Sequence, residues 1–319
     1  MKKVIHFSRA FIPCAVCSTL IILSGVFGII FKGINFGLEF KPGLIEQVSI
    51  EQPAGKNISA DDVRDSLTSL REAEVKETGT ETSIRKNFQI RFGTAGRSNH
   101  DVQTDAVLHD LYNAFGKANV QEISTDYIGS QFSTTLVKNT ILLVCATLVL
   151  IWLYALVRFH WDYAFGAIIA LIHDSFIMMT FVVWTRMEFT TTTIAAILTI
   201  IGYSINATVV ILDRLRENVR KYPDEKNFMF LLDKSLSDTL SRSIITTVTT
   251  MFASVALFVF TTGSIKDFAS ALNIGLISGC YSSIFISSGF IALMNRVKKH
   301  GQVDRTKKES FGFETEVSE

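Results

Sequence analysis

Residues 164–184 read AFGAIIALIHDSFIMMTFVVW, and the only ionisable residues in this stretch are His173 and Asp174 near its centre. A helix of about 20 mostly apolar residues is long enough to cross the roughly 30 Å hydrocarbon core of a bilayer. The stretch therefore predicts a membrane-spanning helix with a polar pair in its middle.

Five further stretches have the same length and apolar character, so the predicted fold class is a polytopic α-helical membrane protein with six transmembrane helices. The first stretch follows a basic start and resembles a signal peptide, but its length and the lack of a small-residue cleavage site favour an uncleaved anchor. In chain order the six predicted spans are residues 10–31, 140–157, 164–184, 190–212, 244–262 and 268–294.

The composition agrees with a membrane protein and excludes other classes. Of the 319 residues, 48% are hydrophobic and 19% are charged, with a net charge of +1, which excludes a nucleic-acid-binding protein and a wholly disordered one. Lys and Arg near span ends mark the cytoplasmic side, so we expect both termini there. The residues that set this orientation are Lys2, Lys3, Arg9, Arg158, Arg214, Arg216, Arg220, Lys221, Arg296, Lys298 and Lys299.

This orientation divides the chain into four regions. Residues 1–31 hold the N-terminus and span one, 32–138 an extracytoplasmic domain, 139–296 spans two to six, and 297–319 a polar cytoplasmic tail that we predict to be disordered. The exported domain has no disulfide to form, because the four cysteines all lie in spans, and the C-x-x-C spacing of the first two is interpreted as helix packing. These cysteines are Cys14, Cys17, Cys145 and Cys280.

The exported domain alternates short strands and helices. Strands are predicted at 44–50, 88–92 and 120–128, with room for a fourth near 74–85, and helices at 59–73 and 101–115. Ser59 followed by Asp62 predicts a capping box at the first helix. The order fits a small ferredoxin-like α+β sandwich. No catalytic constellation, metal-ligand spacing or cofactor motif stands out in the sequence, so we expect a binding or conformational role and no enzyme activity.

Ionisable groups inside spans are costly and usually face the interior of a bundle, which makes each a functional candidate. The pair His173 and Asp174 either takes part in proton transfer or holds helices together. Arg242 begins span five in a hydroxyl-rich run and is either functional or an interfacial anchor. Gly202, Gly275 and Gly279 are predicted to pack helices closely.

A charged motif ends span four at the cytoplasmic boundary. It consists of Asp213, Arg214, Arg216 and Glu217, and helical spacing places Asp213 near the last two. An ion-paired topology anchor and a coupling role are both open for this motif.

Several motifs together carry a resemblance to a known family. They are Gly33-Ile-Asn-Phe-Gly-Leu-Glu-Phe, Ile128-Gly129, Leu171-Ile-His-Asp, Ile201-Gly-Tyr-Ser-Ile-Asn, Asp213-Arg-Leu-Arg-Glu-Asn, Arg242-Ser, Asp267-Phe and Gly275-x-x-x-Gly279-Cys-Tyr-Ser-Ser-Ile-Phe-Ile. In this order, over nearly the whole chain, they resemble the SecF family of bacterial protein-export membrane proteins, part of the resistance-nodulation-division superfamily.

The resemblance implies an accessory subunit in the bacterial cytoplasmic membrane that uses the proton-motive force to help draw secreted chains outward. It implies SecD as a partner, together with the SecYEG channel, SecA, the translocating polypeptide and membrane lipids. YajC and YidC are further candidate partners, and no nucleic acid is expected.

Two departures from the family pattern bear on mechanism. The family has Asp directly after the Asn of span four, but here Ala207 follows Asn206, and Lys41-Pro42-Gly43-Leu44 replaces a glycine-rich turn after span one. The proton-coupling candidates are therefore Asp174, Arg242, His173 and Asn206. Either SecD supplies the missing carboxylate, or Asp174 takes a larger share, or this chain assists export without coupling to protons.

Two other functions fit parts of the pattern. A half-transporter exporting a lipid or small molecule shares the superfamily architecture, although an exported domain of this size is small for it. An intramembrane aspartyl protease needs two facing aspartates, and only Asp174 lies deep in a span.

Overall fold

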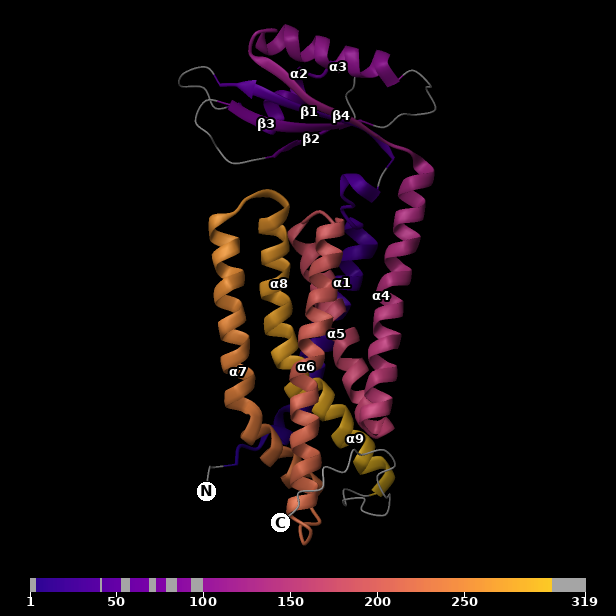
Figure 1. Cartoon of the computed structure of the whole chain (residues 1–319), viewed down its shortest axis with the longest axis vertical. Helices are drawn as coiled ribbons and strands as arrows, with labels where there is room; N and C mark the ends of the chain where they lie inside the picture. The colour runs from indigo at the N-terminus through magenta and orange to yellow at the C-terminus, as the bar shows by residue number, and fades with distance from the viewer. Residues whose placement is uncertain are drawn as a thin grey trace, which may run out of the picture.

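The computed structural model describes residues 4–40, 42–52, 58–68, 73–78, 85–92 and 100–299. A bundle of long helices forms one part of the molecule, and a sheet covered by two short helices sits at one end of it (Figure 1). The predicted disorder of the tail beyond residue 299 concerns residues outside these ranges.

The bundle contains six helices that are long and apolar enough to cross a membrane, which confirms the predicted number of spans. The first is preceded by a short 3-10 turn, η1 (Phe7–Ala10), and the last is continued through a π-helical segment, η3 (Ser282–Ser287). The bundle helices are α1 (Phe11–Lys32), α4 (Ser130–Arg158), α5 (Trp161–Thr185), α6 (Thr191–Lys221), α7 (Phe228–Phe260), α8 (Gly263–Tyr281) and α9 (Ser288–Lys299).

Three helices begin or end well outside the predicted spans. Helix α4 begins at Ser130, α6 continues to Lys221, and α7 begins at Phe228, where the Asn227 side chain accepts hydrogen bonds from the backbone N–H groups of Met229 and Phe230. Hydropathy measures the length that fits in lipid, whereas the helix continues into the polar boundary as long as its backbone stays hydrogen-bonded.

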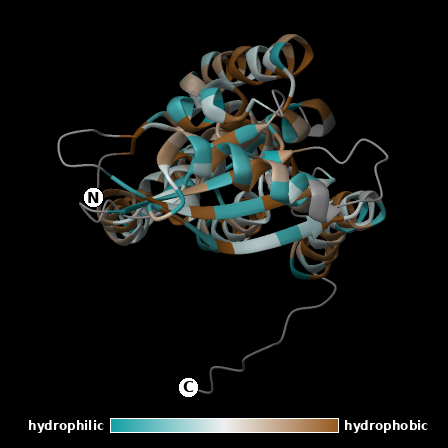
Figure 2. Ribbon diagram, turned by 90° about the horizontal axis from the view of Figure 1, so that it is seen from above, coloured by the Kyte–Doolittle hydropathy of each residue, from teal (hydrophilic) through white to brown (hydrophobic). Residues whose placement is uncertain are grey.

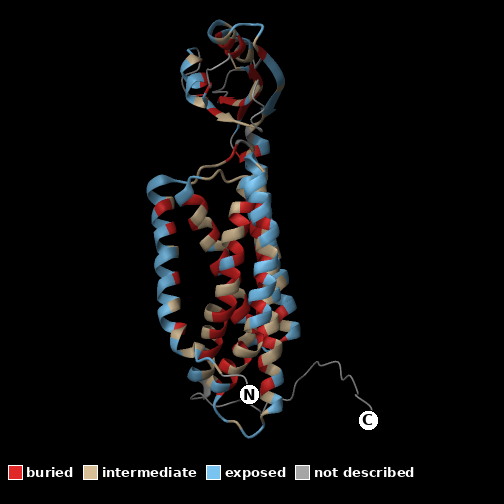
Figure 3. Cartoon of the chain, turned by 90° about the vertical axis from the view of Figure 1, so that its left-hand side faces the viewer, coloured by how far each residue is buried: buried red, intermediate tan, exposed pale blue. Residues whose placement is uncertain are grey.

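Helix α5 lies in the middle of the bundle and packs against α1, α4, α6 and α8. Buried residues concentrate in the centre of the bundle, while the outer helices are largely exposed (Figure 3). Close contact of α1 with α5 depends on Gly25, since a Cβ there would lie 2.7 Å from the Cβ of Thr180. The exposed faces of α1, α4 and α7 carry large apolar side chains, which suits contact with lipid.

The domain at the end of the bundle is built on a four-stranded antiparallel sheet in the order β2-β3-β1-β4. Its elements are η2 (Leu38–Phe40), β1 (Gly43–Glu51), α2 (Ala60–Ser66), β2 (Glu74–Glu77), β3 (Arg85–Phe92), α3 (His100–Phe115) and β4 (Val120–Ile128). The two helices cover the face of the sheet that points away from the bundle (Figure 1), and the strands lie across the bundle when it is seen from above (Figure 2).

Apolar side chains from both layers form the core of this domain. Strands β1 and β3 contribute Val48, Ile50, Phe88 and Ile90, all fully buried. Strand β4 lies at an edge of the sheet, and most of its residues are exposed.

The first domain helix is shorter than its sequence predicted. Ser59 and Asp62 form the expected capping box, but α2 ends at Ser66 instead of residue 73. Leu67 leaves the helical conformation, with φ −82° and ψ 82°, and its side chain is buried in the domain core. Leu70, the next residue of the predicted apolar stripe, lies outside the described residues.

One carboxylate interrupts the apolar face of the sheet. Glu46 lies opposite Ile90 in the β1–β3 register, and it is fully buried. One of its oxygens accepts a 2.6 Å hydrogen bond from the Thr125 hydroxyl, and the other has no partner among the described residues. Burial, with smaller contributions from the charges of Glu122 and Asp126, raises the pKa of Glu46 to about 7 even though the Thr125 hydrogen bond lowers it.

Substituting Glu46→Gln should remove a pH dependence from the stability of the sheet domain. Because the folded pKa is raised from 4.5 to about 7, the folded domain binds a proton between these values and loses stability as the pH rises through that window. Over this pH window the wild-type domain should lose on the order of 2 kcal/mol of its free energy of unfolding, and the variant should not. Amide hydrogen exchange of β1 and β4 in the full chain, measured from pH 5 to about 8, checks this.

Glu51→Gln is the matched control, because Glu51 lies on the same strand but is exposed. An unchanged pH dependence in Glu46→Gln would contradict the assignment.

Candidate functional site

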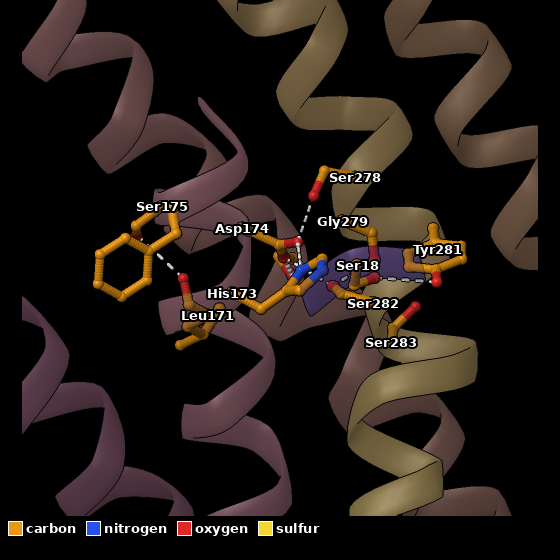
Figure 4. A network of polar contacts seen from close by, with 12 residues as sticks. Ser18, Leu171, His173, Asp174, Ser175, Ser278, Gly279, Tyr281, Ser282 and Ser283 are labelled. Atoms are coloured by element: carbon orange, nitrogen blue, oxygen red, sulfur yellow. Dashed lines mark hydrogen bonds and ion pairs between the residues drawn. The ribbon is translucent and has the colours of Figure 1, made fainter. Parts of the chain in front are cut away.

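The carboxylate of Asp174 on α5 is fully buried inside the bundle. Ser204 of α6 and Ser282 of η3 donate to its Oδ2 at 2.6 and 2.7 Å. Ser278 of α8 donates to its Oδ1 at 2.6 Å, and His173 Nδ1 lies 3.1 Å from the same oxygen. Donors from three helical segments besides α5 itself therefore surround one carboxylate. Figure 4 shows His173, Ser278 and Ser282 beside Asp174.

Packing brings these donors to Asp174. A Cβ on Gly279 would lie 3.2 Å from Ser204 Cβ, so α6 and the end of α8 approach closely beside the carboxylate. Gly275, one turn earlier on α8, lies against Ile200 in the same way. Small residues at a spacing of four thus give two serine hydroxyls access to the same oxygen of Asp174.

A second set of polar contacts joins α1 to this cluster. Tyr281, beside Ser282, donates its hydroxyl hydrogen to the Cys14 carbonyl at 2.7 Å and accepts a 2.9 Å hydrogen bond from the Ser18 hydroxyl. Its ring lies 6.0 Å from the ring of His173. Span one is therefore bound to the end of α8 next to the Asp174 cluster (Figure 4).

The last span changes from α- to π-helix directly after Tyr281. The wider turn alters which carbonyls the backbone can satisfy, and serine hydroxyls supply donors there: Ser283 to the Cys280 carbonyl at 3.0 Å and Ser288 to the Ser283 carbonyl at 3.2 Å. Short π-helical segments often mark functional sites. This one begins at a ligand of the Asp174 carboxylate.

Arg242 and Asn206, the other two proton-coupling candidates, do not contact Asp174. Both side chains are exposed, and neither has a hydrogen bond or ion pair with any described residue. A Cβ on Gly202, one turn before Asn206, would meet no described atom within 4 Å. The four candidates therefore divide into a buried pair on α5 and an exposed pair on α6 and α7.

The charged motif after span four ties three helices together at the far end of the bundle. Asp213 accepts a 2.8 Å hydrogen bond from Arg158 of α4. Arg214 pairs with Glu217 at 2.6 Å and reaches Asp238 of α7 at 2.7 Å. Arg216, the remaining member, also lies on α6, with interactions of its own.

Sequence patterns gave no role to three polar residues at this end: Asn218 appeared only as the last residue of a family motif, and Asp233 and Asp238 belonged to no motif. Asn218 is fully buried and donates to Ser235 at 2.8 Å. Asp233 accepts hydrogen bonds from the Ser8 backbone and hydroxyl at 2.9 and 2.8 Å, which fixes the segment before α1 to the start of α7. Asp238, the partner of Arg214, lies on the same helix. In the sequence, Asn218 follows the apolar part of span four, and Asp233 and Asp238 precede the apolar part of span five. Hydropathy does not show that the helices continue through these residues.

The segment between α1 and the sheet domain is bound to the α5–α6 loop through its backbone. The Gly37 N–H donates to the Phe189 carbonyl at 2.9 Å, and the Phe189 N–H donates to the Asn35 carbonyl at 2.7 Å. Rings of Phe36, Phe40 and Phe189 pack together around these bonds. We call this set of contacts the linker joint.

Charged groups complete the linker joint. The Glu39 carboxylate accepts a 2.9 Å hydrogen bond from the Thr191 N–H in the first turn of α6. Arg186 donates to the last carbonyls of α1 and the linker, Lys32 O and Gly33 O, at 2.9 and 3.1 Å. Lys76 of β2 adds a 3.1 Å ion pair with Glu188. The sheet domain is thus fixed to the loop that joins the two helices of the Asp174 cluster.

Among the described residues, no group of three or more His, Cys, Asp or Glu side chains could hold a metal ion. The arrangement around Asp174 can hold or release a proton, since the carboxylate is surrounded by hydroxyls and one imidazole.

Comparison with known proteins places the chain in a family. The family model for "Protein export membrane protein SecD/SecF, C-terminal" matches residues 107–297, from α3 to α9. The chain belongs to the SecD/SecF family. As expected of that family, it is a multi-pass inner-membrane protein with six apolar helices.

Relatives named as SecF subunits match along nearly their whole length. The chain is 32% identical to "Protein translocase subunit SecF" of Treponema pallidum (strain Nichols), and the match covers 95% of this chain and 99% of the relative. It is 35% identical to the protein of the same name from Borreliella burgdorferi, covering 94% and 99%.

Two crystal structures of the SecD/SecF family share the fold. SecDF from Thermus thermophilus, a translocon-associated membrane protein, superposes with a TM-score of 0.78 at 26% identity, over 92% of this chain and 39% of the other. A structure of SecDF in a super-membrane-facing form gives 0.67 at 26% identity, over 94% and 40%. The chain therefore spans about two fifths of the length of SecDF.

Substituting Glu39→Ala should loosen the linker joint at the start of α6. Loss of a charged acceptor at a helix N-terminus costs about 1 kcal/mol, which corresponds to roughly fivefold faster exchange of the amides it protects. Hydrogen exchange of residues 190–194 in the full chain measures this effect. Asp61→Ala, which removes an exposed carboxylate elsewhere in the same domain, should leave these amides unchanged; equal rates in all three proteins would show that Glu39 does not cap α6.

Proposed function

We propose that this chain works as the SecF-type subunit of a protein translocase in the bacterial inner membrane. In this role it pairs with a SecD subunit to form one bundle, and the pair uses the proton-motive force to assist export of polypeptides through SecYEG, driven from the other side by SecA. The names of the relatives and the SecDF structures support this assignment.

The observation that carries the proposal is the exposed polar pair on α6 and α7. A charged or amide side chain facing hydrocarbon is costly, so such groups normally meet protein or water. Arg242 and Asn206 have no partner among the described residues. A second subunit covering this surface would provide partners for both.

Contacts between α6 and α7 put the two residues at a similar depth. The Tyr203 hydroxyl donates to Thr247 Oγ1 at 3.2 Å, which aligns the two antiparallel helices. Asn206 follows Tyr203 and Arg242 precedes Thr247, so both lie about one turn further along in the same direction. Ala207 occupies that depth as well, where the family pattern has a carboxylate. The open space beside Gly202 permits close approach of a partner helix.

The buried pair on α5 supplies the only deep carboxylate among the four candidates. Because Ala207 has no titratable group, we infer that Asp174, whose Oδ1 faces His173, holds the proton in this subunit and that a SecD carboxylate faces Arg242. The hydrogen-bonded cage around Asp174 supports a role in proton binding, since each of its donors can also accept or turn away.

The exported domain would transmit the change outside the membrane. Its element order and its sheet order β2-β3-β1-β4 support a ferredoxin-like β-α-β-β-α-β domain. The excess of Lys and Arg at the opposite end of the bundle, including Arg158, Arg214 and Lys221, supports cytoplasmic termini and an exported sheet domain.

Copurification tests the assignment. A tagged chain extracted from native membranes in mild detergent should bring down SecD in comparable amount and SecYEG in part. Recovery of the chain without SecD would contradict the proposed function and favour the half-transporter alternative.

Arg242→Ala should reduce the amount of SecD recovered and the rate of export after depletion of the wild-type chain. Removing a buried, paired charge at an interface costs about 2–5 kcal/mol, so we expect loss of most of the complex. Lys266→Ala is the control. Lys266 is exposed near the opposite end of the spans, and its ammonium group lies over the ring of Phe258. If both variants copurify SecD equally, Arg242 does not face the partner.

A further inference from the structure

Ser282 has one hydroxyl hydrogen and two acceptors within reach. Its Oγ lies 2.7 Å from Asp174 Oδ2 and 3.3 Å from the carbonyl of Gly279, one turn earlier in its own helix. A hydroxyl donates only one hydrogen at a time. Ser204 and Ser278, the other serines at the carboxylate, have no second acceptor among the described residues. Ser282 is therefore the ligand of Asp174 that has an alternative.

The charge of Asp174 determines which of these acceptors Ser282 uses. An ionised carboxylate only accepts, and all three serine hydroxyls lie close enough, at 2.6 to 2.7 Å, to donate to it. A protonated carboxyl carries a hydrogen that needs an acceptor. Ser282 meets that need by turning its own hydrogen to the Gly279 carbonyl and accepting from Oδ2.

We propose that Asp174 and Ser282 form a proton-operated switch in which protonation of Asp174 transfers the Ser282 hydrogen bond from α5 to the Gly279 carbonyl, in the last turn of α8 before the π-helical segment. The cross-link between α5 and the last span then changes from a charged hydrogen bond to a neutral one. Hydrogen bonds to charged groups are roughly twice as strong as neutral ones, so the two helices are held less tightly when the proton is bound.

His173 does not take the proton away from this position. With Nδ1–H donating to Oδ1, the Nε2 atom carries a lone pair and has no partner among the described residues. Adding the proton to Nε2 would bury an N–H donor without an acceptor, which costs more than an unused lone pair. The proton is better placed on Oδ2, where Ser282 accepts it.

Other titratable groups lie within the spans that pack against α5. They are Tyr203 on α6, bonded to Thr247; Tyr281 and Cys280 beside Ser282; Cys14 and Cys17 on α1; and the exposed Cys145 and Tyr154 on α4. The charged residues of α1, α6 and α8, including Lys32, Asp213 and Lys266, lie toward the helix ends. Among the described residues, no Lys, Arg, Asp or Glu on α1, α6 or α8 pairs with Asp174.

Tyr281 extends the effect of the switch to span one. It directly precedes Ser282, and its hydroxyl binds α1 through Ser18 and the Cys14 carbonyl. Helix α1 leads through Lys32 and Gly33, which Arg186 holds, into the linker joint and the exported domain. A shift of the π-helical segment would therefore act on the helix that precedes this domain.

The inference rests on the proposed function only for the biological role of proton binding. Its test does not require export. Hydrogen exchange of the full chain in phospholipid nanodiscs is measured from about pD 5 to 9 and corrected for the intrinsic rate. Amides of residues 279–288 should change protection by about fivefold across a single titration, the change expected for one net hydrogen bond. Asp174→Asn should hold the low-pD level at every pD.

Two serine variants make the test specific. In Ser282→Ala the titration of residues 279–288 should disappear, whereas in Ser278→Ala, which removes the donor to the other oxygen, it should remain. Retention of the full titration in Ser282→Ala, or its absence from the wild type, would overturn the switch. The wild type and the two serine variants decide the matter even if Asp174→Asn does not accumulate.

The outcome is separable from that of the proposed function. A titration that depends on Ser282 in a chain that does not copurify with SecD would support the switch and contradict the translocase assignment. Copurification without the titration would do the reverse.

Discussion

A buried carboxylate inside a membrane bundle has to be surrounded by hydrogen-bond donors, and the arrangement of the spans follows from this constraint. Lipid supplies no donors, and an unpaired charge at this depth would cost several kcal/mol. Asp174 is supplied by helices α6 and α8 and by the π-helical segment, and these must stay in one register for three serine hydroxyls to reach two oxygens. The glycine contacts that bring the helices close serve the same purpose, because Gly279 lies directly against Ser204.

The same register connects the membrane part to the sheet domain. Helices α5 and α6 carry Asp174 and Ser204, and the loop between them holds the linker by backbone hydrogen bonds and the Phe36, Phe40 and Phe189 rings. Any rotation of these two helices therefore moves the base of the sheet domain with them. The Lys76–Glu188 ion pair lies near the surface and contributes little to stability, so the backbone hydrogen bonds determine the geometry.

Sequence patterns predicted the parts of the structure that depend on local order. Apolar length identified six spans, and Ser59 with Asp62 identified the cap of the first domain helix. Three of the four domain strands were predicted as well, and the fourth, β2, lies where the sequence left room for one. The end of α2 was not predicted, because Leu67 turns into a core made by distant strands.

Contacts between residues far apart in the chain were not predictable in this way. Asp174 was identified as a deep carboxylate, but its serine donors lie 30 to 108 positions away, and serines are too common in spans to single out. The change from α- to π-helix after Tyr281 leaves no mark in hydropathy. Asp233 and Asp238 precede the predicted fifth span and belong to no sequence motif, and only the folded arrangement shows what they bind.

The exposed edge of the sheet affects how one copy of the chain can pair with another. Strand β4 runs along that edge from Val120 to Ile128, with backbone groups on one side available for pairing. Two copies crowded in the same membrane could join there as a continuous sheet. Glu122 and Asp126 place negative charge along this strand, so pairing of two identical edges would bring like charges together, which disfavours it relative to pairing with a strand that lacks them.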